Sequence, residues 1–195
     1  RTIRRAMSTF PAVLVTGARQ TGKKTLLRKE FGFSHSYLSL ERPDVRSRAL
    51  ADPEGFFEDN QAPLILDEIQ YAPKLLHYIK DRIDENRKAG QWLLTGSQTF
   101  PLMEGVSQTL SGRVAILTLA PLSVAEAQQR LPRGDIDTVL RRVFLGRNKR
   151  SAKDSDKIDF TDWILRGGFP EPRLNEKVDR SLWFSSYVQT YLERD

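Results

Sequence analysis

The sequence contains no cysteine, which excludes disulfide bridges and metal sites built on thiolates. No apolar run approaches the roughly 18 residues that a membrane-spanning helix needs, and no signal peptide is visible. Histidine occurs twice, at His35 and His77, and neither has neighbours that indicate catalysis or metal binding. We therefore expect a cytoplasmic protein that has no membrane partner.

The composition is that of an ordinary globular protein, but its charge is unevenly distributed. The 195 residues, 39% hydrophobic and 29% charged, suffice for one α/β domain with a small satellite subdomain. The net charge is +6, and residues 1–50 hold 11 Lys or Arg against 3 Asp or Glu. This basic surplus fits a nucleic acid partner, although a solvated basic surface explains it as well.

Short β-rich runs alternate with helical patterns along the first two thirds of the chain. The predicted strands cover residues 12–16, 35–40, 64–66, 92–96 and 114–119. Residues 43–59 and 73–88 read as the helices between them. This alternation predicts an α/β fold with a five-stranded, parallel, doubly wound sheet. Ligands of such sheets bind beyond the carboxyl ends of the strands.

The turn after the first predicted strand has the sequence Gly17-Ala18-Arg19-Gln20-Thr21-Gly22-Lys23. Its spacing matches the phosphate-binding P-loop pattern. The two glycines let backbone N–H groups converge on phosphate oxygens, and the following helix N-terminus adds a favourable dipole. We expect Lys23 to reach the β- and γ-phosphates, and Arg19 and Gln20 to contact phosphate or a neighbouring subunit.

The residue after Lys23 departs from this pattern. A Ser or Thr there supplies a hydroxyl ligand to Mg²⁺, but the chain has Lys24 and then Thr25. Mg²⁺ demands near-ideal octahedral oxygen coordination, so loss of the hydroxyl should weaken its binding. The added ammonium still attracts phosphate. We predict that nucleotide binding survives and hydrolysis is impaired, and that Thr25 substitutes only if the loop shifts by one residue.

The third predicted strand ends in Asp67 and Glu68, about 45 residues after the P-loop. An acid at this place supports Mg²⁺, usually through water, and an adjacent Glu orients the attacking water. A helix N-cap is the simpler reading of such a pair. The distance from the P-loop and the helix that follows favour the catalytic reading.

Two further strand ends carry candidate catalytic residues. Ser97 or Gln98, after the fourth strand, is expected to sense the γ-phosphate or to position water, unless this is a plain turn. Arg113, before the fifth strand, is expected to stabilise transition-state charge, either in its own subunit or in a neighbouring one. The alternative for Arg113 is a surface ion pair.

Five segments together resemble a prokaryotic group of AAA+ ATPases: GARQTGKKTLL, LILDEIQYAP, WLLTGSQ, LSGRVAILTLAPLS and GGFPEP. The resemblance implies a P-loop NTPase fold of the AAA+ (ASCE) type and ATP as the nucleotide. It marks Gly17, Gly22, Lys23, Asp67, Glu68 and Arg113 as family motif positions, and the family pattern has Thr where Lys24 stands.

The resembling group usually carries a C-terminal domain of unknown function that is similar to restriction endonucleases. We accordingly expect residues 1–131 to form the P-loop ATPase core. Residues 132–195 are expected to form a helical region that leads into that further domain, with helices at 137–145, 158–166 and 177–193 and a polar loop at 146–157.

The predicted function is that of an ATPase whose ATP binding and hydrolysis drive a conformational change or act on nucleic acid. This hypothesis calls for a homo-oligomer in which an arginine acts in trans. The alternative is a nucleotide-gated binding module with little or no turnover, which Lys24 favours. A small-molecule kinase fits less well, because Asp67-Glu68 and the polar end of the fourth strand are more typical of an ATPase.

Overall fold

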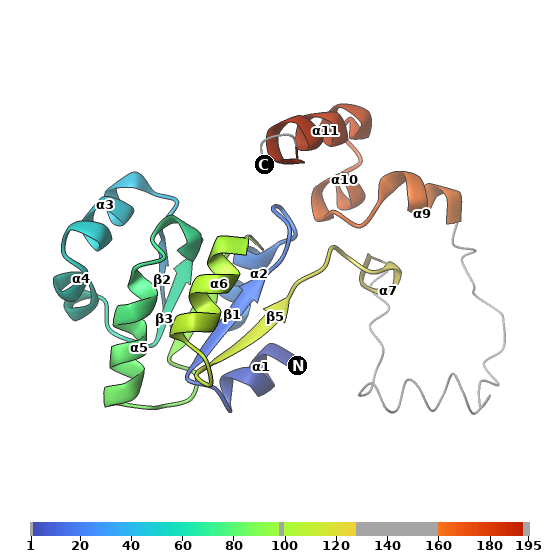
Figure 1. Ribbon diagram of the computed structural model, residues 1–195. Coiled ribbons are helices and arrows are strands. Elements are labelled where there is room, and N and C mark those ends of the chain that lie inside the picture. Colours follow the sequence, from blue (N-terminus) through green and yellow to red (C-terminus); the bar gives the residue numbers. More distant parts are fainter. Residues whose placement is uncertain (1, 98–99, 128–159, 193–195) are drawn as a thin grey trace, which may run out of the picture. The chain divides into compact units, whose positions relative to one another are not determined.

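The structure is a computed structural model that describes residues 2–97, 100–127 and 160–192 (Figure 1). Its backbone divides into two compact units, residues 1–120 and residues 121–195, and each is described by itself. The boundary expected after residue 131, the helix expected at 137–145 and the loop expected at 146–157 lie outside the described residues. Among the described helices, none is long and apolar enough to cross a bilayer.

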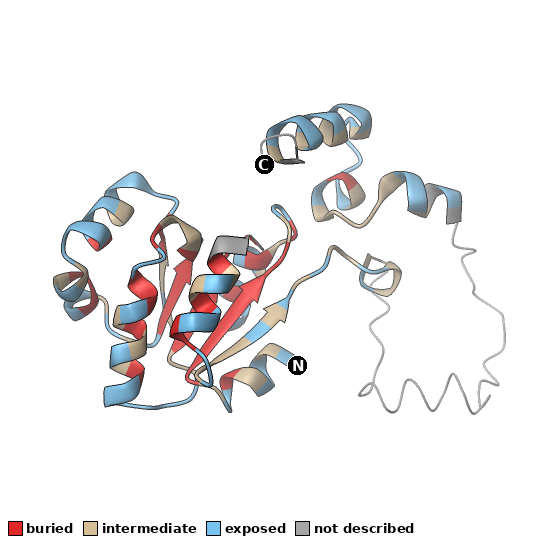
Figure 2. Ribbon diagram, in the orientation of Figure 1, coloured by how far each residue is buried: buried red, intermediate tan, exposed pale blue. Residues whose placement is uncertain are grey.

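The first unit is built on a parallel sheet, as predicted. Its five strands are β1 (Ala12–Thr16), β2 (Ser36–Ser39), β3 (Leu64–Asp67), β4 (Trp92–Thr95) and β5 (Val114–Thr118). They are ordered β2-β3-β4-β1-β5, and all four pairings are parallel. Every residue of β1, β3 and β4 is buried (Figure 2), because helices cover both faces of a parallel sheet.

Alternation along the strands divides the core between the two faces of the sheet. Leu14, Leu66 and Leu94 belong to one buried cluster, with Ile79 of α5 (Leu75–Glu85). Val13, Ile65 and Leu93 belong to a second, smaller cluster, with Leu27 of α2 (Lys23–Phe31). The sheet is therefore doubly wound.

The remaining elements of this unit connect or cover the strands. Two short helices follow β2, and a 3₁₀ turn follows β3: α3 (Pro43–Ala51), α4 (Pro53–Asp59) and η1 (Ile69–Tyr71). The sequence did not lead us to expect α1 (Thr2–Met7) or α6 (Phe100–Thr109). Leu102 and Val106 of α6 are buried in the larger cluster, so packing against the sheet stabilises a segment that contains both proline and glycine.

The second unit holds short helices and one aromatic cluster. Its described elements are α7 (Val124–Ala127), α9 (Phe160–Arg166), α10 (Pro170–Leu174), α11 (Arg180–Tyr187) and the π-helix η2 (Val188–Leu192). Trp183 and Tyr187, one helical turn apart, stack with ring centroids 5.2 Å apart. Phe169 packs against both rings, so these aromatic residues form a small packed cluster.

Candidate functional site

Residues 17–22 form the loop between β1 and α2. At two positions of this loop the backbone has a conformation that only glycine adopts easily. Gly17 has a φ of +140°, and a Cβ atom there would lie 2.3 Å from the carbonyl oxygen of Leu119. Gly22 caps the N-terminus of α2 with a φ of +93°, although a Cβ atom would meet nothing within 4 Å. Close packing therefore requires the first glycine, and backbone conformation favours the second.

Side-chain hydrogen bonds hold this loop in a compact turn. The hydroxyl of Thr21 donates to the carbonyl oxygen of Ala18 at 2.9 Å. Gln20 has a φ of +60°, and its side chain and that of Arg19 are exposed. The contacts with phosphate or a neighbouring subunit that we expected of these two residues stay a prediction.

The Lys23 side chain folds back into the loop and is only 6% exposed. Its ammonium donates to the carbonyl oxygens of Gly17, at 2.9 Å, and Ala18, at 2.8 Å. Burial lowers the pKa of Lys23, and the nearby carboxylates of Glu68 and Asp67 oppose that shift. The loop lysine and the two acids of β3 therefore lie within electrostatic reach of one another.

Asp67 is buried at the end of β3, and three hydroxyl groups from the neighbouring strands donate to its carboxylate. Tyr37 and Ser39 of β2 donate to Oδ2 at 2.6 Å and 3.4 Å. Thr95 of β4 donates to Oδ1 at 2.6 Å. These bonds compensate the cost of burying the carboxylate. The pKa of Tyr37 is raised, mainly by burial and secondly by the hydrogen bond to Asp67. The phenol therefore stays protonated and can act as a donor.

Glu68 has a left-handed backbone, with a φ of +61°. Its backbone N–H donates to the Thr95 hydroxyl at 2.9 Å, and its carboxylate accepts a short hydrogen bond from the amide of Gln70. A left-handed conformation at a residue other than glycine is strained and is often found at functional sites. Thr95, Tyr37 and Gln70 were not among the candidates from the sequence. For Thr95 a signal existed, since it is a polar residue that ends an otherwise apolar strand.

Two candidate residues follow the end of β4, Ser97 and Gln98. Ser97 lies just beyond β4 and is 4% exposed, at the same edge of the sheet as the P-loop and the two acids. Gln98, the other candidate at this strand end, lies outside the described residues.

Arg113 lies at the end of the sheet where β1 begins, and the P-loop lies at the other end, where β1 finishes. Its carbonyl oxygen accepts a hydrogen bond from the backbone N–H of Ala12, at 3.2 Å, where β1 begins. The P-loop follows the last residue of β1, and five residues of strand span about 16 Å. The structure thus does not bring Arg113 to the P-loop of its own chain.

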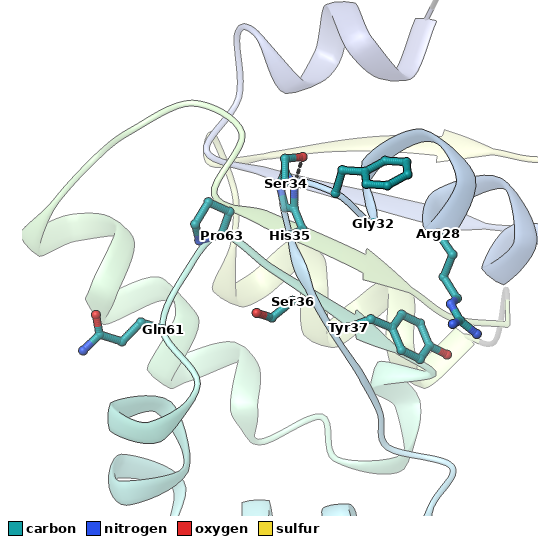
Figure 3. A pocket seen from close by; sticks show the side chains of 9 residues that line it. Arg28, Gly32, Ser34, His35, Ser36, Tyr37, Gln61 and Pro63 are labelled. Atoms are coloured by element: carbon teal, nitrogen blue, oxygen red, sulfur yellow. Dashed lines mark hydrogen bonds between the residues drawn. The ribbon is translucent and has the colours of Figure 1, made fainter.

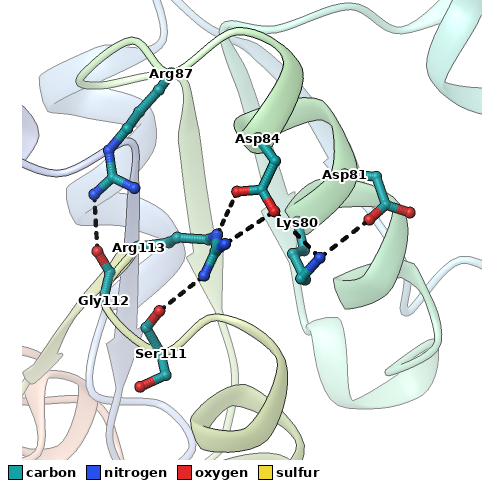
Figure 4. Close-up of polar contacts among 7 residues, drawn as sticks. All are labelled: Lys80, Asp81, Asp84, Arg87, Ser111, Gly112 and Arg113. Atoms are coloured by element: carbon teal, nitrogen blue, oxygen red, sulfur yellow. Dashed lines mark hydrogen bonds and ion pairs between the residues drawn. The ribbon is translucent and has the colours of Figure 1, made fainter.

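The Arg113 guanidinium forms a two-point ion pair with Asp84 of α5 (Figure 4). Its Nε and Nη2 atoms lie 2.6 Å and 2.9 Å from the two carboxylate oxygens. Nη1 donates to the carbonyl oxygen of Ser111 at 3.0 Å. Lys80 also contacts Asp84, at 3.2 Å. Arg113 is thus half-buried in the surface ion pair that was the alternative to a catalytic role.

Lys24 is exposed. Its ammonium lies over the ring of Tyr37, 5.4 Å from the ring centroid. The guanidinium of Arg28, one turn further along α2, lies 5.1 Å from the same centroid. Tyr37 therefore contacts two cations with its ring and the Asp67 carboxylate with its hydroxyl.

A surface cleft lies beside this network, at the end of α2 (Figure 3). It is lined by Arg28, residues 32–37, Gln61 and Pro63. Figure 3 shows the side chain of Arg28 beside the ring of Tyr37. None of the P-loop residues 17–23 lines this cleft, so it is a neighbour of the phosphate loop and not part of it.

The parallel sheet, the glycine-dependent loop and the acids at the end of β3 define a P-loop nucleotide-binding fold. Residues 9–128, more than half of the chain, match the model of the AAA domain family. The chain belongs to that family. Membership implies nucleotide binding, usually with Mg²⁺, and supports an ATPase at the level of the family.

Solved structures agree on the fold. The Walker-type ATPase PABY2304 of Pyrococcus abyssi is 15% identical, with a TM-score of 0.54 over 100% of this chain and 71% of its own. AMPPCP-bound DnaA of Aquifex aeolicus is 12% identical, with a TM-score of 0.50 over 98% of this chain and 60% of its own. Identities this low indicate the P-loop fold alone.

Relatives in sequence are longer than this chain. Uncharacterized proteins of Mycobacterium bovis and Mycobacterium tuberculosis are each 29% identical over 197 aligned positions. The match covers 99% of this chain but only 38% of each of these proteins.

The side chains present do not fit the Mg²⁺ site that is usual for this family. No hydroxyl follows Lys23, and Thr25 is exposed one residue further on. Each oxygen of Asp67 already accepts a hydrogen bond from a hydroxyl group. Within the described part of the chain, no group of three or more His, Cys, Asp or Glu side chains offers another site.

Proposed function

We propose that this chain is an ATP-binding domain that couples nucleotide binding to a conformational change and hydrolyses ATP slowly. One observation carries the proposal: the Lys23 ammonium is folded into the glycine-dependent loop after β1, and Asp67 and Glu68 lie at the same end of the parallel sheet. A triphosphate cradled by residues 17–23 would therefore lie beside two acids. The AAA domain match over residues 9–128 supports the ATP-binding part of the proposal.

Each residue of the site has a role in this proposal. Backbone N–H groups of the loop and Lys23 bind the β- and γ-phosphates. Glu68 orients the attacking water, and Ser97 senses the γ-phosphate from the next strand end. Asp67 is the residue that would support Mg²⁺ through water, but Lys24 removes the hydroxyl that completes such a site. Hydrolysis is therefore slow, and ATP remains bound longer than in a loop that carries threonine.

Phosphate release tests this proposal directly. Release by this chain should be slow and should depend little on Mg²⁺, whereas Lys24→Thr should be faster and should require Mg²⁺. Lys29→Thr is the matched control, because Lys29 is an exposed lysine of the same helix. Equal, Mg²⁺-dependent turnover in this chain and in Lys24→Thr would contradict slow hydrolysis.

Action on nucleic acid in an oligomer is the second part of the proposal. The surplus of 11 Lys or Arg over 3 Asp or Glu in residues 1–50 supports it. Arg113 lies at the far end of β1 from the P-loop of its own chain and pairs with Asp84, so it would have to leave this ion pair to act on the ATP of a neighbouring subunit. ATPase rates that rise with protein concentration and with added DNA would support this role, and rates that depend on neither would contradict it.

A nucleotide-gated binding module without turnover is the alternative, and the Lys24 side chain favours it. In that case ATP binding orders a surface that a partner recognises. Partner binding that requires ATP but releases no phosphate would identify this function. Steady phosphate release during partner binding would exclude it.

A further inference from the structure

Lys24, Tyr37 and Asp67 form one continuous chain of contacts beside the P-loop. The Lys24 ammonium lies 5.4 Å from the centroid of the Tyr37 ring, and the Tyr37 hydroxyl lies 2.6 Å from Asp67 Oδ2. The cation is attracted to the face of the ring. Tyr37 thus links the Lys24 ammonium, which contacts its ring, to Asp67, which accepts from its hydroxyl.

The acid at the end of β3 is largely occupied by this arrangement. A carboxylate offers about four lone-pair positions, and three hydroxyl groups already donate to Asp67. One position remains for a bond from metal-bound water, and a second such bond would have to displace one of these hydroxyl groups. Tyr37 therefore competes with the cation for Asp67.

Lysine and arginine side chains at the loop supply positive charge in place of Mg²⁺. Lys24 and Arg19 are both exposed at or beside the loop, and Lys23 lies within it with its ammonium on the loop carbonyls. An ammonium is a compact point charge that binds phosphate well. A lysine at position 24, next to Lys23 in sequence, can therefore neutralise part of the charge of a bound phosphate.

We infer that this P-loop binds a nucleoside triphosphate without a divalent cation, with the Lys24 ammonium as the countercharge and Tyr37 as the residue that positions it. The inference rests on the proposed nucleotide-binding function and specifies how that site operates. The affinity for ATP should consequently not depend on Mg²⁺. This independence distinguishes the loop from one that carries threonine at position 24.

The test is calorimetric titration of ATP into this chain with excess Mg²⁺ and with excess EDTA. We expect the two dissociation constants to agree within about twofold. Lys24→Thr should bind about tenfold more weakly in EDTA, since it loses a charge-assisted contact, and should regain affinity with Mg²⁺. Lys29→Thr, which removes a lysine from the same helix, should behave like the parent chain.

A second variant tests the competition between the Tyr37 hydroxyl and Mg²⁺ separately from the charge of Lys24. Tyr37→Phe keeps the ring under Lys24 but removes the hydroxyl from Asp67. In the double variant Lys24→Thr/Tyr37→Phe, Mg²⁺ should strengthen ATP binding more than it does in Lys24→Thr alone. An equal response to Mg²⁺ in the single and the double variant would contradict the competition between Tyr37 and the cation.

The outcomes distinguish this inference from the function on which it rests. Binding of ATP by the parent chain that falls at least tenfold when EDTA replaces Mg²⁺ would overturn the inference and leave the proposed ATP-binding function standing. No detectable ATP binding in either buffer would overturn both. Circular dichroism of each variant confirms that it is folded before its affinity is compared.

Discussion

Thr95 donates a 2.6 Å hydrogen bond to Asp67 while its hydroxyl oxygen accepts a 2.9 Å hydrogen bond from the backbone N–H of Glu68. One buried hydroxyl of β4 therefore contacts Asp67, the last residue of β3, and Glu68, which follows it. The side chain of Asp67 is fixed directly, and Glu68 is held in its left-handed conformation through its backbone. The geometry of the two acids thus depends on a residue from the neighbouring strand.

Replacing Thr95 by valine should destabilise the domain by about 1–3 kcal/mol, because Asp67 and the Glu68 N–H each lose a buried hydrogen bond at similar side-chain volume. Urea denaturation measures this change in the free energy of unfolding. Thr95→Ser retains the hydroxyl and should recover most of the loss. A valine variant as stable as the parent chain would show that the hydroxyl is dispensable.

The two glycines of the P-loop should differ in their tolerance of alanine. Gly17→Ala places a Cβ atom 2.3 Å from the Leu119 carbonyl oxygen and should cost more than about 4 kcal/mol or prevent folding. Gly22→Ala meets no atom within 4 Å and should cost only about 1–2 kcal/mol for its left-handed backbone. Thermal unfolding of both variants makes the comparison. Equal stability would argue against the close approach of the loop to residue 119.

Replacing Lys23 by methionine should weaken ATP binding about 10- to 100-fold, because the loop loses its buried ammonium while keeping a side chain of similar length. Titration with ATP measures the loss. Lys29→Met removes a charge from the exposed end of the same helix and should leave affinity within about twofold. Comparable losses in both variants would indicate a general effect of net charge and not a specific contact.

Arg113 should control the titration of Asp84. The pKa of Asp84 lies below its ordinary value of 3.8, mainly because Arg113 donates hydrogen bonds to its carboxylate and to a smaller extent because Lys80 does. The ion pair is consequently complete above that value and is lost as the pH falls through the lowered pKa. In Arg113→Gln the pKa of Asp84 should rise toward the ordinary value, as measured by NMR titration of the carboxyl carbon.

Arg87→Gln is the control for that titration, since Arg87 donates to the carbonyl oxygen of Gly112 and not to a carboxylate. It should leave the pKa of Asp84 unchanged. If Arg113→Gln also left it unchanged, the ion pair in Figure 4 would not persist in solution.

The sequence by itself determined the sheet, the loop and the position of the acids along the chain. Apolar runs bounded by glycine and polar residues predict buried parallel strands, and the five strands form close to where those runs lie. The P-loop is equally local, because its function depends on spacing within seven residues and on the helix that begins at Lys23. Lys24 also stands out from the sequence alone.

Only the tertiary structure decided which side chains meet at the site. Ser39 lies opposite Asp67 because of the register between β2 and β3, and Thr95 reaches Asp67 from β4, 28 positions further along the chain. The sequence allowed Arg113 to act in the site of its own chain. The parallel pairing of β1 and β5 places it at the end of the sheet away from the P-loop. These relationships depend on pairing between distant strands, which hydrophobic periodicity within any one segment does not specify.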